Sequence, residues 1–253
     1  MAPSRVAVAS APGLVRARNE DSAYTGHWLC AVADGMGGHA SGDVASATVI
    51  DAIRQFDAST GVEHLTSVLG SAVRAANAQL AAKAEDQYPL AGMGSTLTAM
   101  LWSGRHVAVA HIGDSRAYVL RDRVLRQITE DHVLRNLVAA PMPASISGYL
   151  VRYLDARPGW SPDLTLRAVQ PGDRYLICSD GLNGFADPDA IRAVLAADGN
   201  ADQTADGLIS LAYAAGAPDN VTVIIVDVPS GTWEEREGNP LVVGAAAELA
   251  SRS

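Results

Sequence analysis

The sequence is poor in the residues that mark several classes of protein. Its 253 residues include only two cysteines, Cys30 and Cys178, so neither a disulfide framework nor a CxxC zinc knuckle can form. No run of about 18 apolar residues occurs, which predicts no contact with a membrane. The N-terminus lacks the apolar core of a signal peptide. These absences together predict a cytoplasmic protein.

Basic residues are also scarce. Lys and Arg number 19 against 28 Asp and Glu, which gives a net charge of −9. An acidic chain repels phosphate backbones, so we expect no nucleic-acid partner. The motifs GxxxxGK[ST] and GxSxG are both missing, which removes support for a P-loop enzyme or a serine hydrolase.

The sequence contains segments typical of both strands and helices. Strands are predicted at 28–33, 95–102, 105–112, 115–121, 124–128, 164–169, 173–178 and 221–228. Helices are predicted at 42–57, from a capping box at Thr60 and Glu63 to Pro89, from Asp187 to Gly199, and at 202–215. Short turns between the middle strands predict antiparallel hairpins, and residues 132–148 are expected to form an irregular surface insertion. We therefore predict an α+β fold of two packed sheets with helices on their outer faces.

Acidic residues fall at the ends of the predicted strands. They are Glu20, Asp21, Asp34, Asp114, Asp180 and Asp219. One such acid alone would indicate a turn, but this many converging carboxylates repel one another unless a cation joins them. An all-oxygen ligand set favours Mg²⁺ or Mn²⁺, whereas the six histidines lack the paired spacing of a zinc site, and His111 is read as a packed strand residue.

Two neighbouring features admit more than one interpretation. Arg16 can hold a phosphate through its fork of donors, or it is a solvated surface residue as Arg18 is expected to be. Residues 35–40 match the dinucleotide pattern GxGxxA after a strand. We favour glycines that let backbone carbonyls approach a metal, because Asp34 would repel a pyrophosphate and the middle strands are antiparallel.

The motifs occur in an order that closely resembles the metal-dependent protein phosphatases (PPM, type 2C) in their bacterial form. They are Arg16 with Asn19 to Asp21, Ala33 to Gly38, Gly92 to Thr96, Gly113 to Tyr118, Thr129 to His132, Cys178 to Leu182, and Asp219 to Thr222. The resemblance runs from about residue 5 to 228. It implies a four-layer αββα sandwich, two antiparallel sheets flanked by helix pairs, with a two-metal site between the sheets.

The resemblance also implies a role for each acid. Asp34 bridges both Mn²⁺ or Mg²⁺ ions, and the Gly35 carbonyl binds one of them. Asp180 and Asp219 bind the other ion. Glu20 and Asp21 hold the metals largely through water, and Asp114 joins Asp180 at a third, weaker metal. Arg16 clamps the phosphate and stabilises its non-bridging oxygens.

The sequence departs from this family at three places, of which the mildest is Ser95-Thr96 where family members usually carry Thr-Thr. Some relatives have a histidine where this chain has Met36, so that general acid is absent. The flap region at 132–157 is shorter than usual and contains proline, which weakens the inference about the substrate.

We predict hydrolysis of phosphoserine and phosphothreonine on proteins by a metal-activated water, in a phosphatase domain at 1–229 with a C-terminal tail at 230–253. A serine/threonine kinase or its targets are the expected partners, and the chain is expected to be a monomer. Two alternatives remain: a pseudophosphatase that only binds a phosphoprotein, and a phosphatase of a stress-signalling anti-sigma antagonist.

Overall fold

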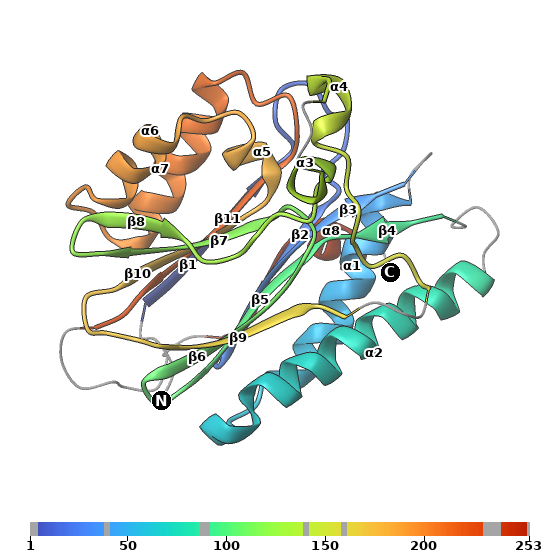
Figure 1. Cartoon of the computed structure of the whole chain (residues 1–253), viewed down its shortest axis with the longest axis horizontal. Helices are drawn as coiled ribbons and strands as arrows, with labels where there is room; N and C mark the ends of the chain where they lie inside the picture. Colours follow the sequence, from blue (N-terminus) through green and yellow to red (C-terminus); the bar gives the residue numbers. More distant parts are fainter. Residues whose placement is uncertain are drawn as a thin grey trace.

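The computed structural model describes residues 5–37, 41–86, 92–138, 142–157, 161–229 and 239–251. The strands of these residues form two antiparallel sheets (Figure 1). One sheet contains, in spatial order, β1 (Arg5–Ala11), β11 (Val221–Asp227), β10 (Arg174–Cys178), β7 (Arg116–Arg121) and β8 (Val124–Gln127). The other contains β12 (Leu241–Gly244), β2 (Asp21–Thr25), β3 (Leu29–Met36), β5 (Leu97–Ser103), β6 (His106–Ile112) and β9 (Asp163–Ala168), with β4 (Gly94–Ser95) paired to β3.

Helices cover the outer face of each sheet (Figure 1). The seven-stranded sheet packs under α1 (Gly42–Ile53), α2 (Leu65–Asp86) and α8 (Ala245–Ala250), and the five-stranded sheet packs under α5 (Asp180–Asn183), α6 (Pro188–Leu195) and α7 (Ala201–Ala214). This is the αββα sandwich that the resemblance implied. None of the described helices is both long and apolar enough to cross a membrane.

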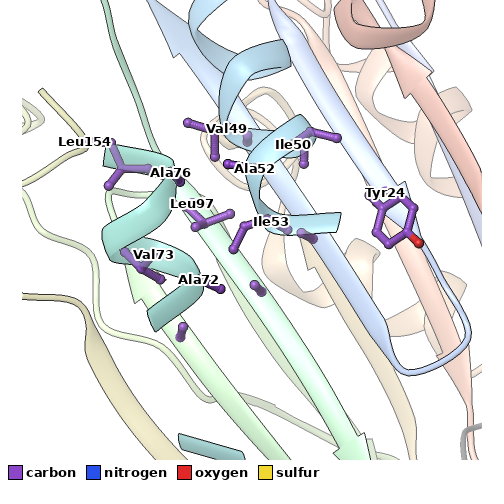
Figure 2. Close-up of a cluster of buried hydrophobic side chains, with 14 of the residues drawn as sticks. Tyr24, Val49, Ile50, Ala52, Ile53, Ala72, Val73, Ala76, Leu97 and Leu154 are labelled. Atoms are coloured by element: carbon purple, nitrogen blue, oxygen red, sulfur yellow. The ribbon is translucent and has the colours of Figure 1, made fainter. Parts of the chain in front are cut away.

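Alternation along the strands builds three apolar layers. In β3, Leu29, Ala31 and Ala33 face the helices, while Cys30 and Val32 face the other sheet. Figure 2 shows the helix-side layer, where small residues of α1 and α2 allow close approach. Between the sheets, the buried ring of Trp102 meets that of Tyr175 from the other sheet edge to face, with their centroids 5.1 Å apart.

The chain changes sheet where a hairpin was predicted. β5 and β6 pair as expected, and so do β7 and β8. The predicted hairpin between β6 and β7 is wrong, because β6 belongs to the seven-stranded sheet and β7 to the five-stranded one. The turn at Gly113 and Asp114 therefore crosses from one layer to the other, and Gly113 adopts a positive φ of 115° that favours glycine.

Two further expectations differ from the structure. The capping box at Thr60 and Glu63 does not form: a 3₁₀ turn at Val62–His64 precedes α2, and Gly61 at its start makes no side-chain cap. The predicted irregular insertion contains two short helices, α3 (Leu134–Leu137) and α4 (Ala144–Ser147), and Val133 before them is buried. Pro89 and the first part of the polar stretch after Pro229 lie outside the described residues.

The C-terminal residues join the sandwich. β12 pairs antiparallel with β2, and α8 packs on α1. The division of the chain at residue 229 stays a prediction, but the strand and helix beyond it extend the same sheet and helical layer.

Candidate active site

Two acids of the seven-stranded sheet face the other sheet. Asp34 continues the alternation of Cys30 and Val32, whose side chains lie between the sheets. Asp21 pairs directly with Asp34 in the β2–β3 ladder. Opposite residues of an antiparallel pair hold their Cβ atoms about 4.5–5.5 Å apart, so the ladder itself forces two carboxylates together.

The five-stranded sheet supplies three more acids. Asp180 begins α5 directly after β10, and Asp219 comes just before β11. Asp114 lies in the turn that leads into β7. Since β11, β10 and β7 are adjacent strands, the three acids gather at one end of this sheet.

These residues meet in one pocket of about 240 Å³. It is lined by Arg16, Glu20, Asp34, Gly35, Met36, Gly37, Thr96, Asp114, Leu150, Asp180, Asp219 and Asn220. All the predicted site residues except Asp21 line it. Asp21 is fully buried next to Asp34, where its carboxylate accepts a hydrogen bond from the Ser179 hydroxyl at 2.6 Å.

Burial, and after it the charges of neighbouring acids, raise the pKa values of the acids. Burial raises the pKa of Asp21 to about 7, and the charges of Asp180 and Asp219 add to this shift. Burial and the charge of Asp180 likewise raise the pKa of Asp114 to about 7. The pKa of Asp34 lies well above its usual range because of burial and the charges of Asp21 and Asp180. The site therefore concentrates negative charge that the protein itself leaves largely uncompensated.

Arg16 is the cation of the pocket that pairs with these acids. Its guanidinium donates a hydrogen bond to Asp219 at 2.7 Å, and its side chain is 53% exposed. This hydrogen bond raises the pKa of Arg16, with further support from the charges of Asp219 and Glu20. An exposed guanidinium at the pocket wall can bind an incoming anion through its remaining donors.

The donor set of the pocket fits hard divalent cations. Among the described residues that line it, the pocket offers carboxylate oxygens and no histidine or thiolate. The Asp21 Oδ1 atom is buried without a hydrogen-bond partner among the described residues. The Gly35 backbone packs so closely on the Gly42 carbonyl that a Cβ at this position would collide with it. Within the described parts of the chain, however, no three such side chains already converge on one point as metal ligands do. The acids surround the pocket, so cations would have to draw them inward.

A model of the protein phosphatase 2C family matches residues 17–204. The chain belongs to the protein phosphatase 2C family. The serine/threonine protein phosphatase PstP of Mycobacterium tuberculosis is 43% identical over 250 residues, which cover 96% of this chain and 48% of PstP. The serine/threonine phosphatase Stp of Listeria monocytogenes is 32% identical, over 85% of this chain and 92% of Stp. The chain thus spans about half the length of PstP and nearly all of Stp.

Solved structures of phosphatase 2C proteins share the fold. A crystal structure of M. tuberculosis PstP has a TM-score of 0.84 at 42% identity and covers 89% of this chain and 98% of its own. The PstP catalytic domain in complex with two manganese ions has a TM-score of 0.81 at 43% identity, with the same coverage.

Several residues of the sequence motifs support this phosphatase 2C site, although the sequence alone predicts no role for them. Asn220 accepts a hydrogen bond from the Glu20 amide at 2.8 Å and donates to the carbonyls of Pro12 and Arg18. It thereby fastens the loop that carries Arg16 to the start of β11. An Asn directly after a site Asp and before a buried strand is the signal that could have indicated this role.

The Asp34 backbone has a similar support on the opposite side of the pocket. Its amide donates to the Thr96 hydroxyl at 3.0 Å, and its carbonyl accepts from the Ser95 hydroxyl at 3.1 Å. These bonds fix the end of β3, which carries Asp34 into the pocket.

His132 holds the turn that carries Asp114. Its Nδ1 accepts a hydrogen bond from the Gly113 amide at 3.0 Å, and its own amide donates to the Gly113 carbonyl at 2.8 Å. Its Nε2 lies 3.2 Å from an Asp163 carboxylate oxygen, which fixes the tautomer that leaves Nδ1 free to accept. The His111 ring stacks on it with a centroid separation of 4.7 Å and lies outside the pocket lining, which confirms that His111 is a packed strand residue.

Proposed function

We propose that this chain is a metal-dependent phosphatase that removes phosphate from serine and threonine side chains of proteins. The observation that carries the proposal is one pocket in which acids from both sheets surround a single exposed arginine. A phosphate monoester is an anion that needs cations on its oxygens and room for a water opposite the leaving oxygen.

Arg16 binds the phosphoryl group in this proposal. Its pairing with Asp219 leaves most of its five donors free, so it can hold a phosphate through two hydrogen bonds while Asp219 orients it. The Asn220 bonds keep the Arg16 loop in register with β11, so the clamp stays aligned with the acids.

We propose Mn²⁺ or Mg²⁺ as the cofactor, two ions per site, with a third at Asp114 and Asp180. Asp34, the Gly35 carbonyl, Asp180 and Asp219 would bind the pair directly, and Glu20 and Asp21 would support them through water. When bound, such ions neutralise charge on phosphate oxygens and lower the pKa of water. The relative PstP, whose catalytic domain binds two manganese ions, supports this choice.

The substrates that we propose are phosphoproteins made by a serine/threonine kinase, or that kinase itself. The names of PstP and Stp as serine/threonine phosphatases support this class. A narrower form of the same proposal takes an anti-sigma antagonist phosphoprotein as the substrate. The cytoplasmic location and the monomeric state stay predictions.

Release of phosphate from a phosphothreonine peptide tests the proposal. We expect turnover with Mn²⁺, none in EDTA, and turnover lowered by at least about 10²-fold in Asp34→Asn with Mn²⁺. A Mn²⁺-loaded protein that binds the peptide in a fluorescence anisotropy assay without releasing phosphate would instead be the pseudophosphatase.

A further inference from the structure

Exposed apolar side chains gather at two segments that border the acidic pocket. Leu14 and Val15 are 64% and 71% exposed and directly precede Arg16, which lines the pocket. Tyr149 is 63% exposed and directly precedes Leu150, which lines the same pocket. We call Leu14, Val15, Tyr149 and Leu150 the apolar rim. Figure 1 shows α3 and α4 of the flap at the same end of the molecule as the loop between β1 and β2.

The backbone on the Arg16 side of the apolar rim is held in place. The Leu14 amide donates to the Ala217 carbonyl at 2.8 Å. Gly13 before it has a φ of 75° and packs so closely on the Asp219 and Ala217 carbonyls that no Cβ would fit. This segment is therefore anchored beside a pocket residue while its two side chains remain in solvent.

The flap side of the apolar rim is anchored in the same way. The Tyr149 amide donates to the Ile146 carbonyl at 3.1 Å, and its carbonyl accepts from the Leu134 amide at 2.9 Å. Leu150 forms an isolated bridge with Val133, and the Val151 amide donates to the His132 carbonyl at 2.9 Å. Large apolar side chains that stay exposed contribute no burial free energy to folding. Clusters of them on a fixed backbone typically mark binding surfaces.

Resting on the proposed function, we propose that the apolar rim binds the residues next to the phosphorylated side chain and selects protein substrates with apolar neighbours there. The pocket of about 240 Å³ accommodates a phosphorylated side chain, so the rest of an extended peptide must lie over its edge. Each residue of such a peptide advances about 3.3 Å, so the first neighbours on either side stay close to the pocket edge, where Leu14, Val15 and Tyr149 adjoin residues that line the pocket. The acids beneath repel acidic neighbours, whereas apolar neighbours lose water against the rim without that repulsion.

Two phosphothreonine peptides test the inference, one with Leu at the two positions on each side of the phosphothreonine and one with Ser there. We expect wild type to favour the Leu peptide in kcat/KM by about tenfold, equivalent to about 1.4 kcal/mol. Leu14→Ser and Tyr149→Ser should each reduce that preference to about threefold or less, because each removes part of the apolar contact. Hydrolysis of p-nitrophenyl phosphate, which has no neighbouring residues, should change less than twofold in either variant.

Val124→Ser is the matched control. Val124 is 49% exposed on the edge strand β8 and does not line the pocket, so its replacement should leave the preference unchanged. A wild type that does not prefer the Leu peptide, or an equal loss in Val124→Ser, would overturn the inference. If neither peptide nor p-nitrophenyl phosphate is hydrolysed, the proposed function fails. The rim is then judged by the affinity of the two peptides in fluorescence anisotropy, where equal binding overturns it.

Discussion

At the scale of single residues, the acids of the pocket lower the stability of the fold, and the same acids supply the chemistry of the site. Like-charged carboxylates forced together by the β2–β3 ladder are what a cation site requires. Burial, and after it the charges of neighbouring acids, raise the pKa values of Asp21 and Asp34, and bound cations would relieve this repulsion.

Replacing Asp34 should abolish most of the activity. We expect Asp34→Asn, Asp180→Asn and Asp219→Asn each to lower kcat with Mn²⁺ by at least about 10²-fold, the scale of a lost electrostatic contact in a transition state. Asp51→Asn, on the exposed side of α1, is the control and should keep full activity. Near-normal kcat in a folded Asp34→Asn protein would disprove its assignment.

Replacing Arg16 should act mainly on substrate affinity. A charged hydrogen-bonding group contributes about 1.5–3 kcal/mol, so Arg16→Ala should lower kcat/KM by about 10- to 150-fold. Arg18→Ala offers a matched comparison, since Arg18 is 60% exposed and lies 3.6 Å from Asp43 on α1. Equal effects of the two substitutions would show that Arg16 is an ordinary surface arginine.

Buried His111 should make the protein less stable in acid. Burial and the neighbouring His132 lower the pKa of His111 to about 4, from 6.5 in the unfolded chain. Between these values the unfolded state binds a proton that the folded state does not, so stability falls as pH falls from 6.5 to 4. The full difference is about 3 kcal/mol.

Urea unfolding across this pH range measures the effect. The His111→Gln variant should lose less stability between pH 6.5 and 4 than wild type, although it is less stable at pH 7 because bonds to Thr98 and Glu130 change. Parallel pH profiles of the two proteins would contradict the assignment.

At the scale of elements, apolar patterning was a reliable guide and local turn chemistry was not. A continuous apolar run that stops at Asp34 predicted β3, and a run rich in Val and Ile predicted β11. The Asp187 cap predicted α6, and its side chain accepts from two amides of the first turn. The change of sheet after β6 could not be read, because a two-residue turn looks the same whether its strands pair or diverge.

The site was predicted as a set of residues but not as an arrangement. Acids at strand ends mark which residues converge, yet the roles of Asn220 and His132 depend on loops that are far apart in sequence. For Asn220 the only sequence signal is its place between a site Asp and a buried strand, and that signal does not reveal which distant carbonyls and amides it binds. The α3 and α4 helices were missed because segments of four residues are too short to show periodicity.

The flap should control substrate choice and leave the chemistry intact. Its attachments to the pocket, at Val133, Leu150 and Val151, lie outside residues 139–147. Replacing 139–147 with a Gly-Ser linker of equal length should therefore change the ranking among phosphopeptides. Turnover of p-nitrophenyl phosphate should stay within about threefold of wild type, since the pocket walls remain. Loss of that turnover in a folded, Mn²⁺-bound protein would place the flap in the catalytic machinery.

At the scale of the whole molecule, the pocket acids come from both sheets, so cations would tie the two layers together. Saturating Mn²⁺ at 100 times its dissociation constant contributes about 2.7 kcal/mol per site, and each kcal/mol shifts Tm by about 2–4 °C in a chain of this size. We expect Mn²⁺ to raise Tm by at least about 5 °C and EDTA to reverse the change.

Differential scanning calorimetry of Asp34→Asn completes this test. The variant should show a much smaller rise with Mn²⁺, yet melt at or above the wild-type temperature in EDTA because one repelling carboxylate is gone. A wild-type Tm that does not respond to Mn²⁺ would contradict the cation site.

The pairing of β1 with β11 has a consequence for synthesis on the ribosome. Ala11 and Val221 are ladder partners, so roughly 210 further residues must be synthesised after β1 before its partner strand β11 exists. At about 5–20 residues per second, that delay is on the order of 10–40 s. During this time Val6 and Val8, which later pack between the sheets, remain exposed on an unpaired strand. The nascent chain is therefore a natural client for a chaperone that holds apolar segments until translation is nearly complete.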